Sequence, residues 1–169
     1  DEIAAALDIL GAKYHEHHDK DLFPLLAELL EQGKTCVSVD LHPHEQRHPN
    51  LVSVQGDIRD RELLRRIFTA HQFDAVFHCA AMLAHDNPDR DVLWQSNVEG
   101  TRNIARAAAK NGVSSIVFTS SNCLWGRRFN RPVHEDDSPE PVEIYGQSKF
   151  EAERILCDYA DRLNVVILR

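Results

Sequence analysis

The chain has 169 residues, of which 43% are hydrophobic and 27% charged, and its formal net charge is −8. This length is enough for one domain with its own core. The acidic balance argues against a nucleic-acid partner, because phosphate recognition needs a basic surface, and no apolar run approaches the ~18 residues that cross a bilayer. We therefore expect a globular protein of the cytoplasm that binds neither nucleic acid nor a membrane.

Residues 1–21 show no convincing strand. Residues 3–10 have the pattern of a short helix, and a polar stretch with several histidines follows them. We expect residues 1–21 to be an unassigned segment and the α/β domain to occupy residues 22–169, without a normal first strand. The chain begins without Met and stops at Arg169 directly after an apolar run, so we expect both ends to be cut from a longer protein.

From residue 22 onward, helical and extended patterns alternate. The expected helices are 22–30, 60–70, 89–111 and 145–163, and the expected strands are 35–39, 51–55, 75–81, 115–119 and 165–168. Gly33 and Gly112 stand where helix ends favour glycine. Strands that alternate with helices require right-handed crossovers, which predicts an open parallel sheet of the doubly wound, Rossmann-like α/β class.

The cysteines and histidines form no recognisable metal motif. No two cysteines have the CxxC spacing, and we expect free thiols in a reducing compartment. The histidines form two groups, which are His15, His17 and His18 with Asp19, and His42, His44 and His48. Neither group has the HExxH or paired Cys/His spacing of a zinc site, so solvated loops without a metal are expected.

Tyr145 and Lys149 are four positions apart, which places a phenol and an ammonium on one face of a helix. A nearby ammonium stabilises phenolate, so Lys149 is expected to lower the pKa of Tyr145 and make it a base for an alcohol. Ser121 follows the strand at 115–119, at the edge where open α/β sheets bind ligands. Its hydroxyl is placed to bind the same substrate oxygen. The alternatives are a packed tyrosine below a surface lysine and a serine that caps the strand end.

These residues belong to five motifs that occur in order along about residues 25–169. The motifs are GDIRD at 56–60, FHCAA at 77–81, NVEGT at 97–101, TSS at 119–121 with LWG at 124–126, and YGQSK at 145–149. In this order and spacing the chain resembles extended short-chain dehydrogenases/reductases of the sugar-nucleotide epimerase type, the NAD-dependent epimerase/dehydratase family. The resemblance implies a dinucleotide-binding domain over 22–169 that is truncated before the family's C-terminal substrate domain.

The resemblance implies NAD as the cofactor and a role for each motif residue. Tyr145 is the catalytic base, Lys149 lowers its pKa and holds the nicotinamide ribose, and Ser121 binds the reacting sugar hydroxyl. The implied cofactor-binding residues are Asp40, Asp57, Ile58, Cys79, Ala80, Ala81, Asn97, Tyr145 and Lys149.

Within that set, Asp40 matches the acidic residue that binds the adenosine ribose hydroxyls. Its carboxylate would repel a 2′-phosphate and so favours NAD over NADP; a loop cap is the alternative for Asp40. Asp57 would accept from the adenine amino group, Ile58 would pack on the ring, residues 79–81 would let the backbone pass close to the cofactor, and Asn97 would order the active-site hydrogen bonds.

The glycine fingerprint of the family is missing from its expected place. When counted back from Gly33, the three glycines fall near positions that hold Glu16, Asp19 and Leu22. Glycines serve there for the tight turn, for backbone approach to the pyrophosphate and for helix packing. Two of the three residues are acidic, where phosphate would bind. Whether the chain binds NAD is therefore open at this point.

The resemblance implies an NAD-dependent epimerase that acts on a nucleotide sugar by transient hydride transfer, as a homodimer through helices near 89–111 and 145–163. Asn122 and Cys123 stand where a dehydratase carries an acidic pair, which disfavours dehydration. Two alternatives stay open. One is a simple reductase or hydroxysteroid-type dehydrogenase, which uses the same Ser-Tyr-Lys set. The other is a non-catalytic Rossmann-like fragment that has lost its phosphate loop.

Overall fold

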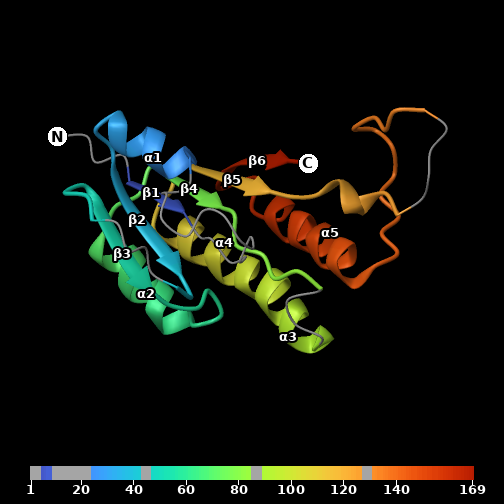
Figure 1. The fold of residues 1–169 in the computed structure, drawn as a ribbon, viewed down its shortest axis with the longest axis horizontal. Helices are drawn as coiled ribbons and strands as arrows, with labels where there is room; N and C mark the ends of the chain where they lie inside the picture. The colour runs from blue at the N-terminus through green and yellow to red at the C-terminus, as the bar shows by residue number, and fades with distance from the viewer. Residues whose placement is uncertain (1–4, 9–23, 43–46, 85–88, 127–130) are drawn as a thin grey trace.

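Six strands form one parallel sheet in the order β3-β2-β1-β4-β5-β6 (Figure 1). The computed structural model describes residues 5–8, 24–42, 47–84, 89–126 and 131–169. The strands are β1 (Ala5–Asp8), β2 (Thr35–Asp40), β3 (Leu51–Gln55), β4 (Ala75–His78), β5 (Ser115–Thr119) and β6 (Asn164–Leu168). This order reverses direction between β1 and β4, and the doubly wound class predicted from the alternation is confirmed.

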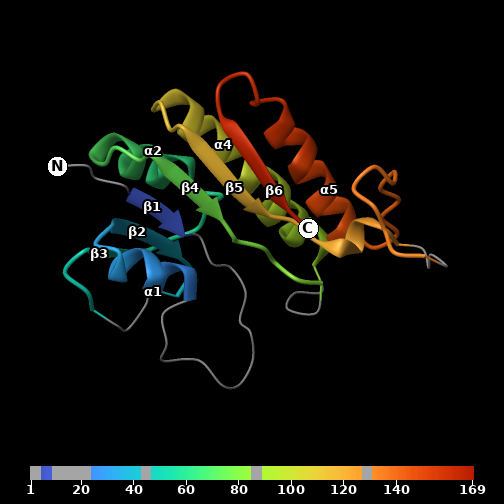
Figure 2. The same ribbon diagram turned by 90° about the horizontal axis from the view of Figure 1, so that it is seen from above.

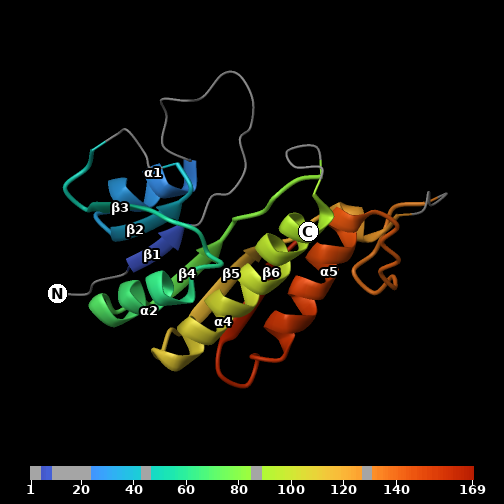
Figure 3. The ribbon, with the colours of Figure 1, turned by 90° about the horizontal axis from the view of Figure 1, so that it is seen from below.

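Helices lie on both faces of the sheet, as Figures 2 and 3 show. The helical elements are α1 (Pro24–Glu31), α2 (Arg61–Ala70), α3 (Arg90–Trp94), η1 (Gln95–Glu99), α4 (Gly100–Lys110), η2 (Asn122–Leu124) and α5 (Ile144–Cys157). Helix α1 lies on one face, and α2, α4 and α5 lie side by side on the other. Among the described residues, no helix is both long and apolar enough to cross a membrane.

The prediction that the sheet lacks a normal first strand is wrong. Ala5–Asp8 is a strand, and it pairs in parallel with β2 on one side and β4 on the other, at the centre of the sheet. The helix expected over residues 3–10 is therefore wrong for these four residues. A four-residue alanine-rich run has too few residues for its period to show, and pairing on two sides overrides its helical propensity.

The helix expected over 89–111 is divided into three parts. Helix α3 leads into the π-helical turn η1, and α4 follows. Helix α4 ends at Lys110, and Gly112, whose φ of 71° is left-handed, stands two residues after it. The helix expected to reach residue 163 ends at Cys157, because a series of turns follows it. Strand β4 ends at His78, so 79–81 form the loop that leaves its carboxyl end.

The main core lies between the sheet and the face that carries α2, α4 and α5. Alternate strand residues point into it, such as Val37 and Val39 of β2 and Ile116 and Phe118 of β5, all at most 1% exposed. A smaller cluster around Leu26, Leu30 and Cys36 joins α1 to the opposite face. Since both faces are packed near β2, its four successive central residues are buried instead of alternating between buried and exposed.

The position of β1 is open to a direct test by amide hydrogen exchange. Because its main chain pairs on both sides, we expect the amides of Ala5–Asp8 to exchange as slowly as those of β4 and more slowly than those of the edge strand β3. Mass spectrometry of peptic fragments, or NMR, gives these rates. Exchange of the Ala5–Asp8 amides as fast as in the exposed turn at 134–137 would contradict this topology.

Candidate active site

The candidate site forms where β5 ends and α5 begins. Ser121 comes two residues after β5, and Tyr145 lies in the first turn of α5. A side-chain hydrogen bond joins Ser121 to Tyr145. The Ser121 Oγ also accepts from the Cys123 main-chain N at 3.1 Å, which caps the short helix η2. The alternative role of Ser121 as a cap is therefore present together with its contact to Tyr145.

Lys149 lies one turn further along α5 and is buried, with 2% of its surface exposed. Its ammonium lies over the ring of Phe118, 4.1 Å from the ring centre, and makes no hydrogen bond to another described residue. Burial lowers the pKa of Lys149 from its usual 10.5 to about 8, although the Cys79 thiol and the Glu153 carboxylate act to raise it. A desolvated ammonium without a hydrogen-bond acceptor is prepared to donate to oxygen atoms of a ligand.

The expectation that Lys149 lowers the pKa of Tyr145 does not hold in this structure. Burial of the half-buried phenol raises its pKa above the usual value, the nearby Cys123 raises it further, and only the hydrogen bond from Ser121 lowers it. The spacing of four residues places both side chains on one helical face, but the ammonium instead lies over Phe118. Tyr145 is therefore a phenol at neutral pH.

Asn97 connects three parts of the site. It is 2% exposed in the π-helical turn η1, its Oδ1 accepts from Met82 N at 2.7 Å, and its Nδ2 donates to Met82 O at 2.9 Å. The same Nδ2 donates to Ser148 Oγ at 3.0 Å, and Ser148 Oγ donates to Tyr145 O at 2.7 Å. Asn97 thus fixes the loop after β4 against the first turn of α5, as a helix residue that orders hydrogen bonds would.

The predicted adenosine-side residues follow β2 and β3. Asp40 Oδ1 accepts from the main-chain N of His42 at 2.7 Å, so the alternative of a loop cap is realised at this carboxylate. Asp57 pairs with Arg59 through contacts of 2.5 to 3.0 Å, and these outweigh the effect of burial, so that the pKa of Asp57 is lowered. Ile58 is 5% exposed and packs against Gly100, which leaves little of its side chain for an adenine ring.

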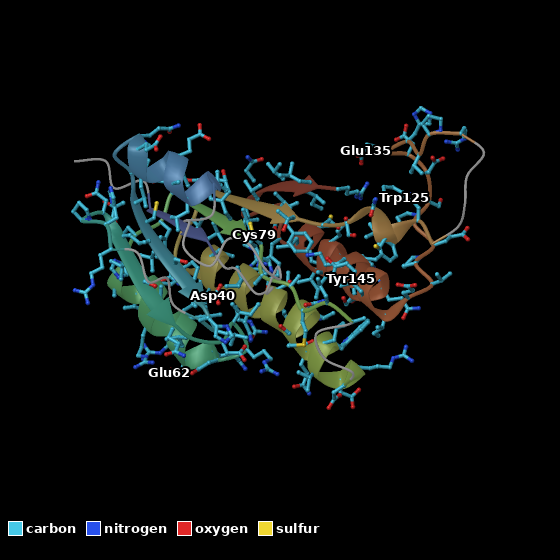
Figure 4. The ribbon with its side chains drawn as sticks, viewed as in Figure 1. Asp40, Glu62, Cys79, Trp125, Glu135 and Tyr145 are labelled. Carbon is cyan, nitrogen blue, oxygen red and sulfur yellow. The ribbon has the colours of Figure 1, made fainter. Side chains whose placement is uncertain are left out.

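Figure 4 shows Asp40, Cys79 and Tyr145 along the carboxyl edge of the sheet, at the ends of β2 and β4 and the start of α5. Ala80 and Ala81 are buried beside Cys79. The expected phosphate-loop positions Glu16, Asp19 and Leu22 lie outside the described residues. With β1 ending at Asp8, the sequence between β1 and α1 contains a single glycine, Gly11.

The two histidine groups of the sequence lie partly outside the described residues. His15, His17, His18, Asp19 and His44 lie outside the described residues, and in the described part of the chain no three His, Cys, Asp or Glu side chains are grouped to hold a metal. The four cysteines, all within the described residues, form no disulfide; Cys36 is buried, and Cys123 and Cys157 are exposed.

Three further residues lie beside the site, which are Ser120, Glu153 and Arg169; sequence reasoning interpreted Ser120 as a cap of the strand end and missed the other two. Glu153 is 3% exposed and accepts from both of the others. The available signal was its spacing: Glu153 follows Lys149 by four positions on α5, the same interval that separates Lys149 from Tyr145. Nothing in the sequence indicated Arg169 as the partner of Glu153.

A doubly wound sheet with Ser121, Tyr145 and Lys149 at its carboxyl edge defines a Rossmann-like domain of the short-chain dehydrogenase/reductase class. A sequence profile of the NAD dependent epimerase/dehydratase family matches residues 24–169. The chain belongs to this family, as the five motifs predict.

Known relatives agree with this assignment. The chain is 41% identical over 121 residues to UDP-glucose 4-epimerase of Neisseria meningitidis serogroup B, across 68% of this chain and 36% of that protein. It superposes with a TM-score of 0.82 and 28% identity on a short-chain dehydrogenase/reductase superfamily protein from Agrobacterium tumefaciens with bound NAD, and covers 48% of it. It also superposes on the Bordetella bronchiseptica enzyme WbmG in complex with NAD, with a TM-score of 0.83 and 26% identity, and covers 53% of that chain. The chain therefore spans about a third to a half of the proteins it matches.

Gly146 allows α5 to approach the loop that carries Ser121. A Cβ at this position would collide with the main-chain carbonyl of Cys123 and lie 3.1 Å from Pro141 Cβ. An alanine normally stabilises a helix interior. Here we expect Gly146→Ala to destabilise the fold by about 1–3 kcal/mol in urea unfolding, because a backbone atom cannot move aside cheaply. Gln147→Ala, at the next and partly exposed position, is the control; equal stability of the two variants would contradict the close contact.

Burial of Lys149 also predicts a pH dependence of stability. Its pKa is lower in the folded chain, about 8, than its usual 10.5. Between these values the unfolded chain binds the extra proton, so the contribution of Lys149 to the free energy of unfolding rises with pH over this window and is constant below it. Urea unfolding of wild type and Lys149→Met at pH 8 and pH 10 measures the effect. We expect the free energy of unfolding of the wild type to rise relative to that of Lys149→Met between pH 8 and pH 10. An equal change in both proteins would contradict a buried amine.

Proposed function

We propose that the whole protein is an NAD-dependent epimerase that acts on a nucleotide sugar by transient hydride transfer. The observation that carries this proposal is the hydrogen-bonded pair of Ser121 and Tyr145 beside the buried Lys149. The relative from Neisseria meningitidis, a UDP-glucose 4-epimerase, supports the reaction, and the two crystal structures with NAD support the cofactor. In this proposal Ser121, Tyr145 and Lys149 are the catalytic residues.

The residues at the carboxyl edge fit NAD in charge and in hydrogen bonding. Lys149, buried and without a hydrogen bond among the described residues, would donate to the hydroxyls of the nicotinamide ribose. Asp40, at the end of β2, would accept from the adenosine ribose hydroxyls and would repel the 2′-phosphate of NADP. The other residues proposed to line the cofactor are Asp57, Ile58, Cys79, Ala80, Ala81 and Asn97. NAD, when bound, supplies the acceptor and donor of the hydride.

Tyr145 is the group that handles the proton of the sugar hydroxyl. Since burial raises its pKa, it begins as a phenol and becomes a base only when positive charge is brought close to it. Ser121, which shares a hydrogen bond with Tyr145, would hold the sugar oxygen during this transfer. An epimerase then returns the hydride to the opposite face of the keto sugar, while Tyr145 returns the proton.

Two neighbouring residues favour epimerisation over dehydration. Asn122 and Cys123, in the short helix η2, occupy the places where a dehydratase carries an acidic pair. Neither is a carboxyl group, so the proton transfers of a dehydration have no dedicated acid and base there. A reductase or hydroxysteroid-type dehydrogenase would need no more than Ser121, Tyr145 and Lys149, and it stays the alternative enzyme.

A non-catalytic Rossmann-like fragment is the second candidate. It is favoured by the single glycine between β1 and α1, because a pyrophosphate needs several close backbone N–H groups at this turn.

We also propose that the protein works in the cytoplasm as a homodimer. In this arrangement α4 and α5, which lie side by side on one face, pack against the same helices of a second copy (Figure 3).

Calorimetric titration with NAD, with NADP as the comparison, tests the cofactor site. We expect NAD to bind, NADP to bind at least about tenfold more weakly, and Lys149→Met to weaken NAD binding by about tenfold or more, because a charge-assisted hydrogen bond is lost. Lys110→Met, at the exposed end of α4, is the matched control and should bind as the wild type does. A folded chain that binds neither nucleotide would support the non-catalytic alternative.

A further inference from the structure

Glu153 is a buried carboxylate that the proposed reaction does not use. It lies on α5 with 3% of its surface exposed, two turns after Tyr145 and one after Lys149. Its Oε1 accepts from Ser120 Oγ at 2.5 Å and from Arg169 Nε at 3.0 Å, and its Oε2 accepts from Arg169 Nη2 at 2.7 Å. Both oxygens are therefore satisfied, and the pairing with the guanidinium is bidentate.

This carboxylate joins three elements at the edge of the site. Ser120 precedes Ser121 at the end of β5, and its main-chain N donates to Leu168 O of β6 at 2.6 Å. Arg169 follows β6, and its Nη1 reaches Glu135 at 2.7 Å while its guanidinium lies 5.5 Å from the ring centre of Trp125. Figure 4 shows Trp125 and Glu135 near the carboxyl ends of β5 and β6. Removal of Glu153 would release the link that fixes the residue next to Ser121.

The same carboxylate lies one helical turn after Lys149 on α5. The groups that act on the buried ammonium come from two elements: the Cys79 thiol and the His78 ring from the end of β4, and the Glu153 carboxylate from α5. Phe118 of β5 provides only its ring face. His78 is fully buried and neutral, because burial and the charge of Lys149 lower its pKa to about 3. Glu153, which is paired with Arg169, is thus the carboxylate among the groups that act on Lys149.

We propose that Glu153 is a positioning residue of this site, whose buried carboxylate fixes Ser121 through Ser120 and supplies negative charge one helical turn from Lys149. The role rests on the proposed function, since Ser121 and Lys149 are the groups that Glu153 would position. Arg169 has a defined part in it: by pairing with Glu153, it neutralises some of the charge that would otherwise act on Lys149.

Measurement of the pKa of Lys149 without added nucleotide tests this role, with two variants that are expected to shift this pKa in opposite directions. Glu153→Gln keeps the size and an acceptor for Ser120 but removes the charge, so we expect the pKa of Lys149 to fall by about half a unit or more. Arg169→Gln leaves Glu153 in place without its neutralising partner, so we expect the pKa to rise. NMR titration of the lysine ε-CH₂ signal, identified by its loss in Lys149→Met, measures both. Glu151→Gln, which removes an exposed partner of Arg154 on the same helix, is the control and should change nothing.

A role confined to holding the fold together would lower the unfolding midpoint of Glu153→Gln and leave the Lys149 titration where it was. That result in folded variants, or an equal shift in Glu151→Gln, would overturn the proposal. If Glu153→Gln does not fold, Arg169→Gln still tests the proposal, because we expect this variant to raise the pKa of Lys149; an unchanged pKa would contradict the proposal. Titration of wild type and Glu153→Gln with NAD then separates the positioning role of Glu153 from the proposed NAD-dependent function. Failure of the wild type to bind NAD counts against the proposed function, whereas the pKa shifts stand without it.

Discussion

The site depends on a cation that the fold holds almost out of water. Lys149 lies between β4, β5 and α5 with 2% exposure, where an uncompensated charge would cost several kcal/mol. Three features make this position tolerable. The ring face of Phe118 attracts the ammonium, Glu153 supplies a negative charge one turn away, and His78 stays neutral beside it. What burial cannot provide is a hydrogen bond, and an oxygen-rich ligand would supply it.

The arrangement of α5 follows from this buried lysine. With Lys149 fixed against β5, the residue four positions earlier faces Ser121 and the residue four positions later faces Ser120. Gly146 allows the first turn to come against the Cys123 carbonyl, and Ser148 connects it to Asn97. A single helical face thus carries the proton-transfer group, the cation and its counter-charge, while adjacent positions hold the helix in place.

Patterns in the sequence were enough to predict the domain from residue 24 onward, because its helices are amphipathic and its strands are apolar runs. Strands β2, β3 and β5 lie where they were expected, within a residue. The first strand could not be predicted, since Ala5–Asp8 is extended only through its partners on both sides. Likewise, the four-residue spacing of Tyr145 and Lys149 indicated a pair but not the direction of the tyrosine pKa. That direction depends on where the ammonium comes to lie, which is a property of the core and not of the helix.

The protonation of His78 shows how tightly this core is specified. Thr101 has one hydroxyl proton, and it donates that proton to Asn97 O at 2.6 Å. The 2.7 Å contact between Thr101 Oγ1 and His78 Nε2 therefore requires the imidazole to donate through Nε2, which leaves Nδ1 as a bare acceptor without a partner among the described residues. A second proton on this ring would place two cations in one dry pocket, so the neutral ring is the form that the fold can hold beside Lys149. The end of β4 is in this way tied to the Asn97 turn through Thr101, and the strand end, the π-helical turn and the lysine depend on one another.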